Sequence, residues 1–306
     1  RNLELNTDVS PNRPTVTIGL PVWNGEHYLP GCIDALLAQT YQDYELIISD
    51  NGSTDRTGEI CLEYAARDRR IRYVRQPVNM GPFKNYNFLL DEAKGEFFMW
   101  APVDDRWSPN FVEELHKTLV ENADSVGAQG DWLIIGPDDE PLTAPDVFEE
   151  MQRDSRLGRI LPLAWRHYMG LLFYGLFRTE VLRRFGMRSL PLAKNYARHC
   201  EYPVLYFLGS VGKIRTNRNA HFLYRRHPDQ DSNRSYPLRV SLALELGFII
   251  GVPIAVWEGC RSPWAAFRAC LGITGKRLSY LGGQLLRLPQ RLKRLSRARR
   301  PQSSSL

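Results

Sequence analysis

The sequence contains little cysteine, and its cysteines show no metal-binding spacing. The five residues Cys32, Cys61, Cys200, Cys260 and Cys270 are scattered and odd in number, and no CxxC pair occurs. This argues against a disulfide framework or a structural zinc site and is typical of the reducing cytoplasm. The opening residues also lack the basic-then-apolar pattern of a signal peptide.

Three glycine motifs of common enzymes are missing as well. No GxGxxG follows the first predicted strand, so a dinucleotide-dependent oxidoreductase is poorly supported. There is no GxxxxGK[ST] phosphate-binding loop and no GxSxG nucleophile elbow. No internal repeat is visible either. The 306 residues, 43% of them hydrophobic and 24% charged, have the composition of an ordinary globular protein.

Positive charge is concentrated near the end of the chain. The net charge is +6, but residues 276–306 hold nine Lys or Arg and no acid, whereas the remainder holds 31 basic and 34 acidic residues. A nucleic-acid-binding domain spreads its positive charge over a folded face, so no nucleic-acid partner is expected. Leucines recur among the charges of 272–295. This pattern favours contact with an anionic membrane surface over the alternative, a solvated tail.

The first part of the chain alternates predicted strands with predicted helices. This rhythm predicts a mostly parallel sheet with helices on both faces. The predicted strands are Thr15–Val22, Tyr44–Asp50, Ile71–Arg75 and Glu96–Ala101, and the predicted helices are Tyr28–Thr40, a segment from Ser53 or Thr54 to about Ala66, Gly81–Ala93 and Asn110–Val120.

After Ser125 the rhythm breaks, and this half is expected to cover the open edge of the site. The apolar run Val240–Trp257 is interrupted by Pro253. At about eighteen residues it lies at the lower limit for a membrane span, and we expect a buried or interfacial helix pair there. The predicted strands of this half are Ser125–Ile135, Phe173–Arg178, Lys213–Thr216 and His221–Tyr224, and the predicted helices are Thr179–Phe185 and Tyr202–Leu208.

Carboxylates directly follow two of the predicted strands. Asp50 ends the second strand, and Asp104 and Asp105 follow the fourth. Open α/β sheets bind ligands at the carboxyl ends of their strands, and Mg²⁺ or Mn²⁺ takes one or two carboxylates together with substrate phosphates. The alternative is a helix cap or a turn. Because Ser53 and Asp55 can also cap the helix after Asp50, a ligand is favoured for at least one of the three.

Two further segments carry candidate residues. Glu201 precedes Tyr202-Pro203, just outside a predicted helix N-terminus, where the helix dipole favours an ionised carboxylate suited to a general base. The alternatives are a surface glutamate or His199 as the base. Arg225 and His227 can bind phosphate and metal, or form a surface basic cluster paired with Asp229 and Asp231.

Taken in order, these segments resemble a family 2 glycosyltransferase with the GT-A fold. The resemblance covers roughly residues 14–230, and its most specific part is 45–55, Glu-Leu-Ile-Ile-Ser-Asp-Asn-Gly-Ser-Thr-Asp. The other matching pieces are Pro21-Val22-Trp23-Asn24-Gly25, Tyr28-Leu29, Gln39-Thr40-Tyr41, Asn79-Met80-Gly81, Asn85, Gly95-Glu96 and the Asp104-Asp105 region.

The resemblance implies transfer of a sugar from a nucleoside-diphosphate sugar to an acceptor hydroxyl, with inversion and with a divalent cation, Mn²⁺ or Mg²⁺. It implies that Glu201 is the general base and that Asp104 and His227 lie at the metal. Two departures stand out: Pro102 replaces the first Asp of the DxD-type motif, and Glu201 replaces the more common Asp. The implied nucleotide-sugar-binding residues are Pro21, Val22, Asn24, Asp50, Asn51, Asn79, Gly81, Asn85, Asp104 and Arg225.

We therefore expect a GT-A domain over 14–235, with a nucleotide-sugar half 14–125 and an acceptor half 126–235, and a helical basic region over 236–306. The expected function is glycan or glycolipid synthesis at the cell surface, by a cytoplasmic enzyme peripheral at the inner face of the plasma membrane, on a glycan or lipid-linked acceptor. One alternative, motivated by Pro102, is a non-catalytic relative that binds a nucleotide sugar or glycan. The other is a nucleotidyltransferase, which would need a basic Gly-rich loop where 22–25 carries no charge.

Overall fold

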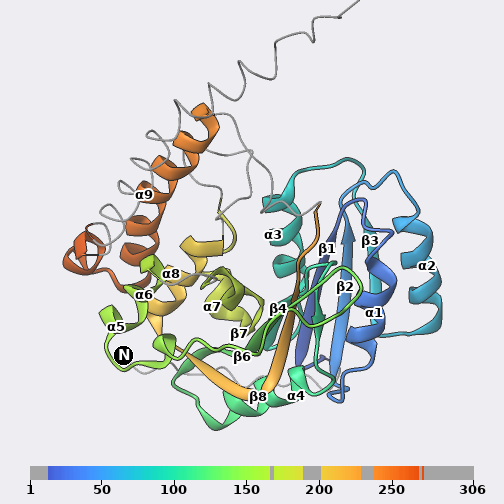
Figure 1. The fold of residues 1–306 in the computed structure, drawn as a ribbon, viewed down its shortest axis with the longest axis horizontal. Helices are drawn as coiled ribbons and strands as arrows, with labels where there is room; N and C mark the ends of the chain where they lie inside the picture. The colour runs from blue at the N-terminus through green and yellow to red at the C-terminus, as the bar shows by residue number, and fades with distance from the viewer. Residues whose placement is uncertain (1–12, 166–168, 189–200, 229–237, 269–270, 272–306) are drawn as a thin grey trace, which may run out of the picture.

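The computed structural model describes residues 13–165, 169–188, 201–228, 238–268 and 271. One eight-stranded sheet runs through it (Figure 1), in the spatial order β3-β2-β1-β4-β7-β6-β8-β5. In chain order the strands are β1 Val16–Val22, β2 Tyr44–Asp50, β3 Ile71–Arg75, β4 Phe97–Trp100, β5 Arg106–Trp107, β6 Ser125–Ile135, β7 Leu176–Arg178 and β8 Lys213–Arg225.

The strand directions bring most strand ends to one edge of the sheet. β1 is parallel to β2 and β4, and β2 is parallel to β3. β7 is antiparallel to both β4 and β6, while β6 and β8 are parallel. β1 to β4, β6 and β8 therefore point the same way, and their carboxyl ends share an edge. The mostly parallel sheet expected from the sequence is confirmed.

Helices connect these strands and cover both faces of the sheet (Figure 1). The first four lie close to their predicted ranges, and the second half adds short helices and one long one. The helices are α1 Leu29–Leu37, α2 Thr57–Arg67, α3 Pro82–Glu92, α4 Phe111–Glu121, α5 Arg156–Ile160, α6 Pro162–Trp165, α7 Thr179–Arg183, α8 Glu201–Val211 and α9 Leu238–Cys260, with the 3-10 turns η1 Glu150–Gln152 and η2 Met169–Tyr174.

The central strands form the core because helices cover both of their faces. Every residue of β1 and β4 is buried, as expected for parallel strands with continuous apolar sequence. The indole of Trp100 in β4 stacks on Phe173 of η2, with ring centroids 4.4 Å apart. This contact joins β4 of the first half of the chain to η2 of the second half.

Three predicted elements of the second half are wrong in their boundaries. Lys213–Thr216 and His221–Tyr224 form one strand, β8, because the register with β6 shifts between Gly130 and Asp131 and takes up the intervening Asn-rich segment as a bulge. Phe173–Arg178 is extended only from Leu176, because η2 holds the preceding residues. The two-residue strand β5, which pairs with β8, was not predicted from the sequence.

The predicted helix pair at 240–257 is a single helix, α9, with Pro253 inside it. A proline removes one helical hydrogen bond, and the packing of α9 along α8 holds the helix together across that position. Glu201 is the first residue of α8 rather than a residue outside it. Pro203 is then the third residue, still in the first turn, where backbone N–H groups have no helical partner.

The connection from α3 to β4 is tied to the amino end of β1. The Thr17 hydroxyl donates to Glu45 Oε1 at 2.7 Å and accepts the Gly95 N–H at 2.9 Å. A Cβ on Gly95 would lie 2.6 Å from Thr17 N and 2.7 Å from Val16 C, which are backbone atoms that cannot turn aside. Glycine is therefore required here by the close approach of two backbone segments.

We predict that Gly95→Ala destabilises the fold by about 1–3 kcal/mol, because the added methyl group pushes β4 away from β1. Urea unfolding followed by circular dichroism measures this change. Lys94→Ala, at the exposed neighbouring position, is the matched control and should stay within about 0.5 kcal/mol of wild type. Equal stability of the two variants would contradict the close approach.

Candidate functional site

The residues singled out from the sequence gather at the carboxyl edge of the sheet. Pro21 and Val22 end β1, Asp50 ends β2, and Asp104 follows β4. His227 follows β8, which points the same way as β4. The structure thus brings together side chains from positions far apart in the sequence. Pro21 and Val22 are buried in the sheet, so their contribution is to place the loop that follows them.

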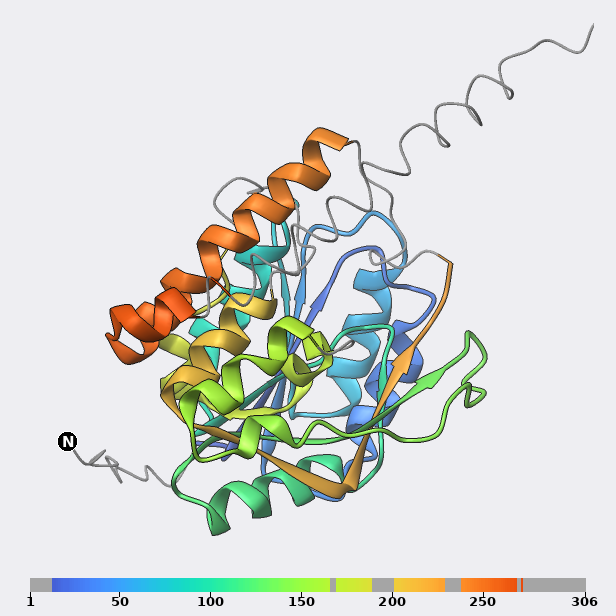
Figure 2. The same cartoon turned by 60° about the vertical axis from the view of Figure 1, so that its left-hand side comes forward.

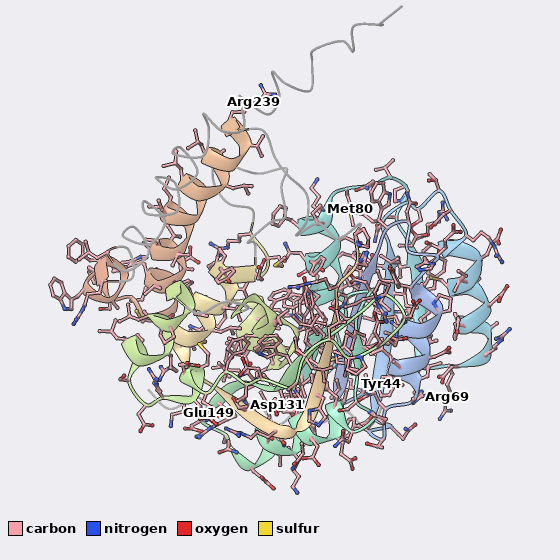
Figure 3. The ribbon with its side chains drawn as sticks, in the orientation of Figure 1. Tyr44, Arg69, Met80, Asp131, Glu149 and Arg239 are labelled. Carbon is pink, nitrogen blue, oxygen red and sulfur yellow. The ribbon has the colours of Figure 1, made fainter. Side chains whose placement is uncertain are left out.

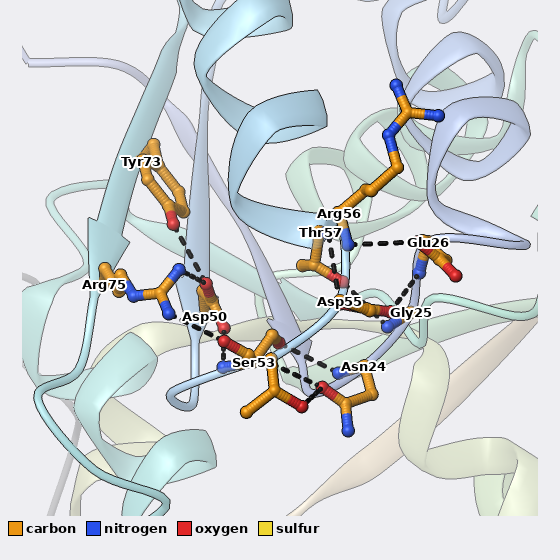
Figure 4. A network of polar contacts seen from close by, with 11 residues as sticks. Asn24, Gly25, Glu26, Asp50, Ser53, Asp55, Arg56, Thr57, Tyr73 and Arg75 are labelled. Atoms are coloured by element: carbon orange, nitrogen blue, oxygen red, sulfur yellow. Dashed lines mark hydrogen bonds and ion pairs between the residues drawn. The ribbon is translucent and has the colours of Figure 1, made fainter.

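The loop after β1 is fastened to the loop after β2 (Figure 4). Asn24 Oδ1 accepts the Thr54 N–H at 2.8 Å, and the Asn24 N–H donates to Ser53 Oγ at 2.8 Å. The Gly25 N–H donates to Thr57 Oγ1 at 2.9 Å. Asn24 adopts a φ of 51°, a conformation that asparagine tolerates better than most residues. Asn24 therefore fixes two loops at the rim of the site.

Asp50 is fully buried beneath these loops (Figure 4). Its Oδ1 accepts the Ser53 N–H at 2.8 Å, and its Oδ2 accepts the Tyr73 hydroxyl at 2.9 Å and Arg75 Nη1 at 3.4 Å. Burial, followed by the hydrogen bond to Asp50, raises the pKa of Tyr73 to about 12. Arg75, whose side chain is 52% exposed, thus pairs with a carboxylate that is itself fully buried.

The loop after β3 is held by an asparagine pair. Asn51 Nδ2 donates to Asn79 Oδ1 at 3.0 Å, and Asn51 Oδ1 accepts the Met80 N–H at 2.9 Å. Met80 marks this loop in Figure 3. Gly81 has a φ of 83°, and a Cβ there would meet nothing within 4 Å. The backbone at Gly81 therefore faces open space that a ligand can enter.

Asn85 has a structural part beside the one implied by the resemblance. It is buried in α3, its Oδ1 accepts the Ser49 hydroxyl at 2.6 Å, and its Nδ2 donates to the Ser49 carbonyl at 3.0 Å. Both ends of its amide are used to hold α3 against β2. Asn85 therefore supports the site from behind, and its direct contact with a nucleotide sugar stays a prediction.

Asp104 and His227 lie side by side at the centre of the edge. Their Oδ2 and Nε2 atoms are 3.1 Å apart. Asp105 points inward instead and is buried, where its Oδ1 accepts the Arg225 N–H at 2.7 Å. Burial, and next the charge of Asp104, raise the pKa of Asp105 well above its ordinary value. Asp104 is thus the carboxylate that faces the site, and Asp105 is the one that anchors the turn.

Arg225 is buried at 1% exposure, and its guanidinium is bonded to protein groups. Nε donates to the Asp104 carbonyl at 2.7 Å, and Nη1 donates to the carbonyls of Gly136 and Pro137 at 2.8 and 2.7 Å. Nη2 forms an ion pair with Asp139. The expected phosphate clamp is therefore directed into the protein, and it braces the Asp104 turn against the loop after β6.

Glu201 stands on the second half of the chain, facing Gly170. A Cβ on Gly170 would lie 2.7 Å from Glu201 Oε1. Tyr174, at the end of η2, lies within electrostatic reach of Glu201, Asp105 and Asp104. Burial and then the negative charges around it, those three carboxylates among them, raise the pKa of the Tyr174 phenol well above its usual range.

Three alternative sequence candidates lie outside the described residues, and two aromatic residues were missed. His199, Asp229 and Asp231 are the three outside. Tyr174 carries no motif, so no sequence signal identifies it. Tyr28 belongs to a quoted motif, but its contacts with His227 (centroids 4.8 Å apart) and with Arg225 (5.2 Å from the guanidinium carbon to the ring centroid) require the fold to be seen.

The donor atoms at Asp104 and His227 suit a divalent cation. A carboxylate oxygen and an imidazole nitrogen, together with diphosphate oxygens and water, make a set that Mn²⁺ accepts. Among the described residues no group of three or more His, Cys, Asp or Glu side chains is arranged to hold a metal. A cation bound by Asp104 and His227 would therefore take its remaining coordination from the diphosphate oxygens of a bound nucleotide and from water.

We predict that Arg225→Lys destabilises the fold by about 2–4 kcal/mol. A lysine presents three donors from one nitrogen and leaves buried carbonyls of the 136–139 loop without a partner. Chemical denaturation measures the loss. Arg218→Lys is the matched control, because its ion pair with Glu149 is largely exposed and such pairs contribute little. If Arg225 acted only as a phosphate ligand, both variants would unfold like wild type.

Comparison with known proteins places this architecture in a family. A sequence profile of glycosyl transferase family 2 matches residues 17–185. Glycosyltransferase GlyA of Streptococcus pneumoniae is 38% identical over 106 residues, which is 35% of this chain and 15% of that protein. The uncharacterized glycosyltransferase EpsJ of Bacillus subtilis is 30% identical over 184 residues, 57% of this chain and 51% of that protein. The chain thus spans at most about half the length of these two relatives.

Among solved structures, S. aureus TarS 1-349 in complex with UDP-GlcNAc is similar, with a TM-score of 0.64 at 15% identity over 87% of this chain and 73% of that chain. At this identity the likeness concerns the fold alone, and it confirms the GT-A fold class expected from the sequence. The profile match extends over more than half of the chain. The protein therefore belongs to glycosyl transferase family 2.

Proposed function

We propose that the chain transfers a sugar from a nucleoside-diphosphate sugar to an acceptor hydroxyl with inversion. The observation that supports this most is the Asp104–His227 pair at the carboxyl edge of the sheet, whose Oδ2 and Nε2 atoms lie 3.1 Å apart. Family membership gives the reaction class.

The donor's nucleoside would enter at the ends of β1 and β2, and its diphosphate would reach Asp104. Gly81 leaves room beside this path. Asp104, with His227 beside it, would hold a divalent cation, which supplies positive charge for the leaving diphosphate. Asp105 and Arg225 keep the Asp104 turn in place, so the carboxylate is positioned before the donor arrives.

Glu201 would take the proton from the acceptor hydroxyl as it attacks the anomeric carbon. One base is enough for a single displacement, which inverts the anomeric configuration. Its place at the first residue of α8 favours the ionised carboxylate, because the helix N-terminus carries a partial positive charge. Replacing the more common aspartate with glutamate lengthens the reach by one methylene and keeps the same chemistry.

A second candidate function is a relative that binds the donor without turnover, and Pro102 favours it. Pro102 stands where the resemblance implies the first carboxylate of the metal motif. Its carbonyl lies 3.4 Å from the Asp105 nitrogen, which donates to it, and 3.5 Å from Cys32 Sγ. The proline therefore shapes the turn but supplies no side-chain ligand, so the cation would depend on Asp104 and His227.

The proposed donor is suggested by a solved relative, whereas the proposed acceptor and location are suggested by the sequence. TarS was solved with UDP-GlcNAc, so a UDP-sugar is the first donor to test. From the sequence we also propose a glycan or lipid-linked acceptor, a role in cell-surface glycan or glycolipid synthesis, and a peripheral place at the inner face of the plasma membrane. Membrane binding by 276–306 stays a prediction, since that segment lies outside the described residues.

We predict that one of UDP, GDP and dTDP binds in a Mn²⁺-dependent way and that Asp104→Ala abolishes the Mn²⁺ dependence. Isothermal titration calorimetry of each nucleotide, with and without Mn²⁺, measures this. Asp138→Ala is the control, since Asp138 is exposed on the loop after β6. Absence of binding for every nucleotide under both conditions would remove the donor site as proposed.

We predict that Glu201→Gln lowers kcat by about 10²–10⁴-fold and leaves the dissociation constant of the donor nucleotide unchanged, because only proton removal is lost. Transfer assays with the donor identified by calorimetry measure kcat. Glu180→Gln, at an exposed position in α7, controls for the loss of a surface carboxylate. Unchanged transfer by Glu201→Gln would assign the base to another residue. No transfer by wild type, with donor binding intact, would favour the non-catalytic alternative.

A further inference from the structure

One face of α9 is apolar and exposed. Leu246, Ile250, Ile254 and Trp257 are 39–46% exposed, and their spacing of four, four and three residues places them in one stripe along the helix. Large apolar side chains on a single helix face seldom stay in water unless they meet a partner. In Figures 1 and 2 the helix lies at the outside of the molecule, beyond α8.

Exposed apolar side chains also follow the end of α9. Residues 263–268 are helical, and within and just after them Trp264, Phe267 and Leu271 are 51–66% exposed. The rings of Trp264 and Phe267 stack with centroids 5.7 Å apart. We call the seven residues of the two segments the apolar stripe: Leu246, Ile250, Ile254, Trp257, Trp264, Phe267 and Leu271.

The opposite face of α9 is packed onto the protein. Leu244, Val252 and Val256 are buried, and a Cβ on Gly259 would collide with Ser210 of α8. Glu258 forms a 2.8 Å ion pair with Arg188. The helix is thus apolar on both sides, and within the part of the chain that the structure describes the folded domain covers one of them. A helix that is apolar all round is normally buried or in contact with lipid.

The charges around the apolar stripe are positive. Arg239 at the start of α9 (Figure 3), Arg261 at its end and Arg268 are all exposed. From 238 to the end of the sequence there are 12 Lys or Arg and two acids, Glu245 and Glu258, and Glu258 is neutralised by its ion pair. An apolar face with exposed arginines near its ends, and with two tryptophans in it, fits an anionic lipid surface.

The packing of α9 on α8 bears on whether the helix would cross a membrane or lie flat on its surface. By length and composition Leu242–Cys260 is long and apolar enough to cross a membrane, with a mean hydropathy of 1.6. To cross, it would have to leave α8 and break the Arg188–Glu258 pair. Lying flat needs no such change, because the stripe already faces outward.

We propose that the apolar stripe lies flat in the interface of an anionic lipid bilayer and docks the folded domain on the membrane. This inference does not depend on the sugar-transfer proposal. It also differs from binding by the basic tail alone, because it assigns the contact to apolar side chains of α9 and the segment after it. The site would then act on acceptors presented at the bilayer surface.

The first test uses the full chain and vesicles of phosphatidylcholine, alone or mixed with an equal part of phosphatidylglycerol. The variant combines Leu246→Gln, Ile250→Gln and Ile254→Gln, because glutamine keeps the helix and removes apolar surface. We expect it to lose at least tenfold in partitioning to the mixed vesicles by co-sedimentation. Leu62→Gln with Val120→Gln, which are exposed apolar positions away from the stripe, should bind like wild type.

Nucleotide binding is measured for each variant as well. The proposal requires nucleotide affinity to stay unchanged, so a loss of vesicle binding alone is distinguished from a failure of the donor site. Vesicle binding that is equal in the stripe variant and wild type, and is released completely by high salt, would assign the contact to the basic tail and overturn the proposal. A wild-type dimer that sediments without lipid and is lost in the stripe variant would assign the surface to a second copy of the chain.

The second test measures depth by tryptophan fluorescence with lipids brominated at different positions along the acyl chain. Quenching should be strongest for bromine near the headgroups and should fall in Trp264→Phe, because that residue would lie at the interface. Strongest quenching by bromine at the bilayer centre would mean that α9 crosses the membrane, contrary to the proposal.

Discussion

The buried guanidinium of Arg225 is the interaction on which the site depends. A cation withdrawn from water is tolerated only when its donors are satisfied. Here they bond to the Asp104 carbonyl, to two carbonyls of the loop after β6 and to Asp139. One side chain therefore fixes the turn that presents Asp104 and the loop that follows β6. Arg225, at the end of β8, thus ties the turn after β4 to the loop after β6.

The same logic governs the other rim of the site. Asp50 is held by Tyr73, Arg75 and the Ser53 N–H, and Asn24 ties the loops above it. Residues that a motif marks as ligand-binding are thus also residues that build the loops. Their side chains have partners before any ligand arrives. The cost of ordering is met during folding, which leaves less to be lost on binding.

The sequence was sufficient to predict the parallel part of the fold and the edge where the site lies. Alternating elements with apolar strands leave few topologies, and Asp50 and Asp104 follow strands whose ends share an edge. It could not predict the direction of a side chain. From the sequence, Arg225 beside His227 was expected to bind phosphate. In the structure its guanidinium is buried and points into the protein. Local propensity likewise splits β8 at its bulge, since only pairing with β6 reveals one strand.

The apolar surface of α9 could not be predicted from the composition of its sequence. A run of apolar residues such as 240–257 predicts burial, but it does not indicate whether protein or lipid covers the side chains. The structure separates the run into a face packed on α8 and a face that meets solvent. Because α8 begins at Glu201, the helix proposed to carry the catalytic base is packed directly against the helix proposed to touch lipid. A bilayer contact at α9 would therefore orient the acceptor side of the site relative to the membrane through a single helix–helix interface.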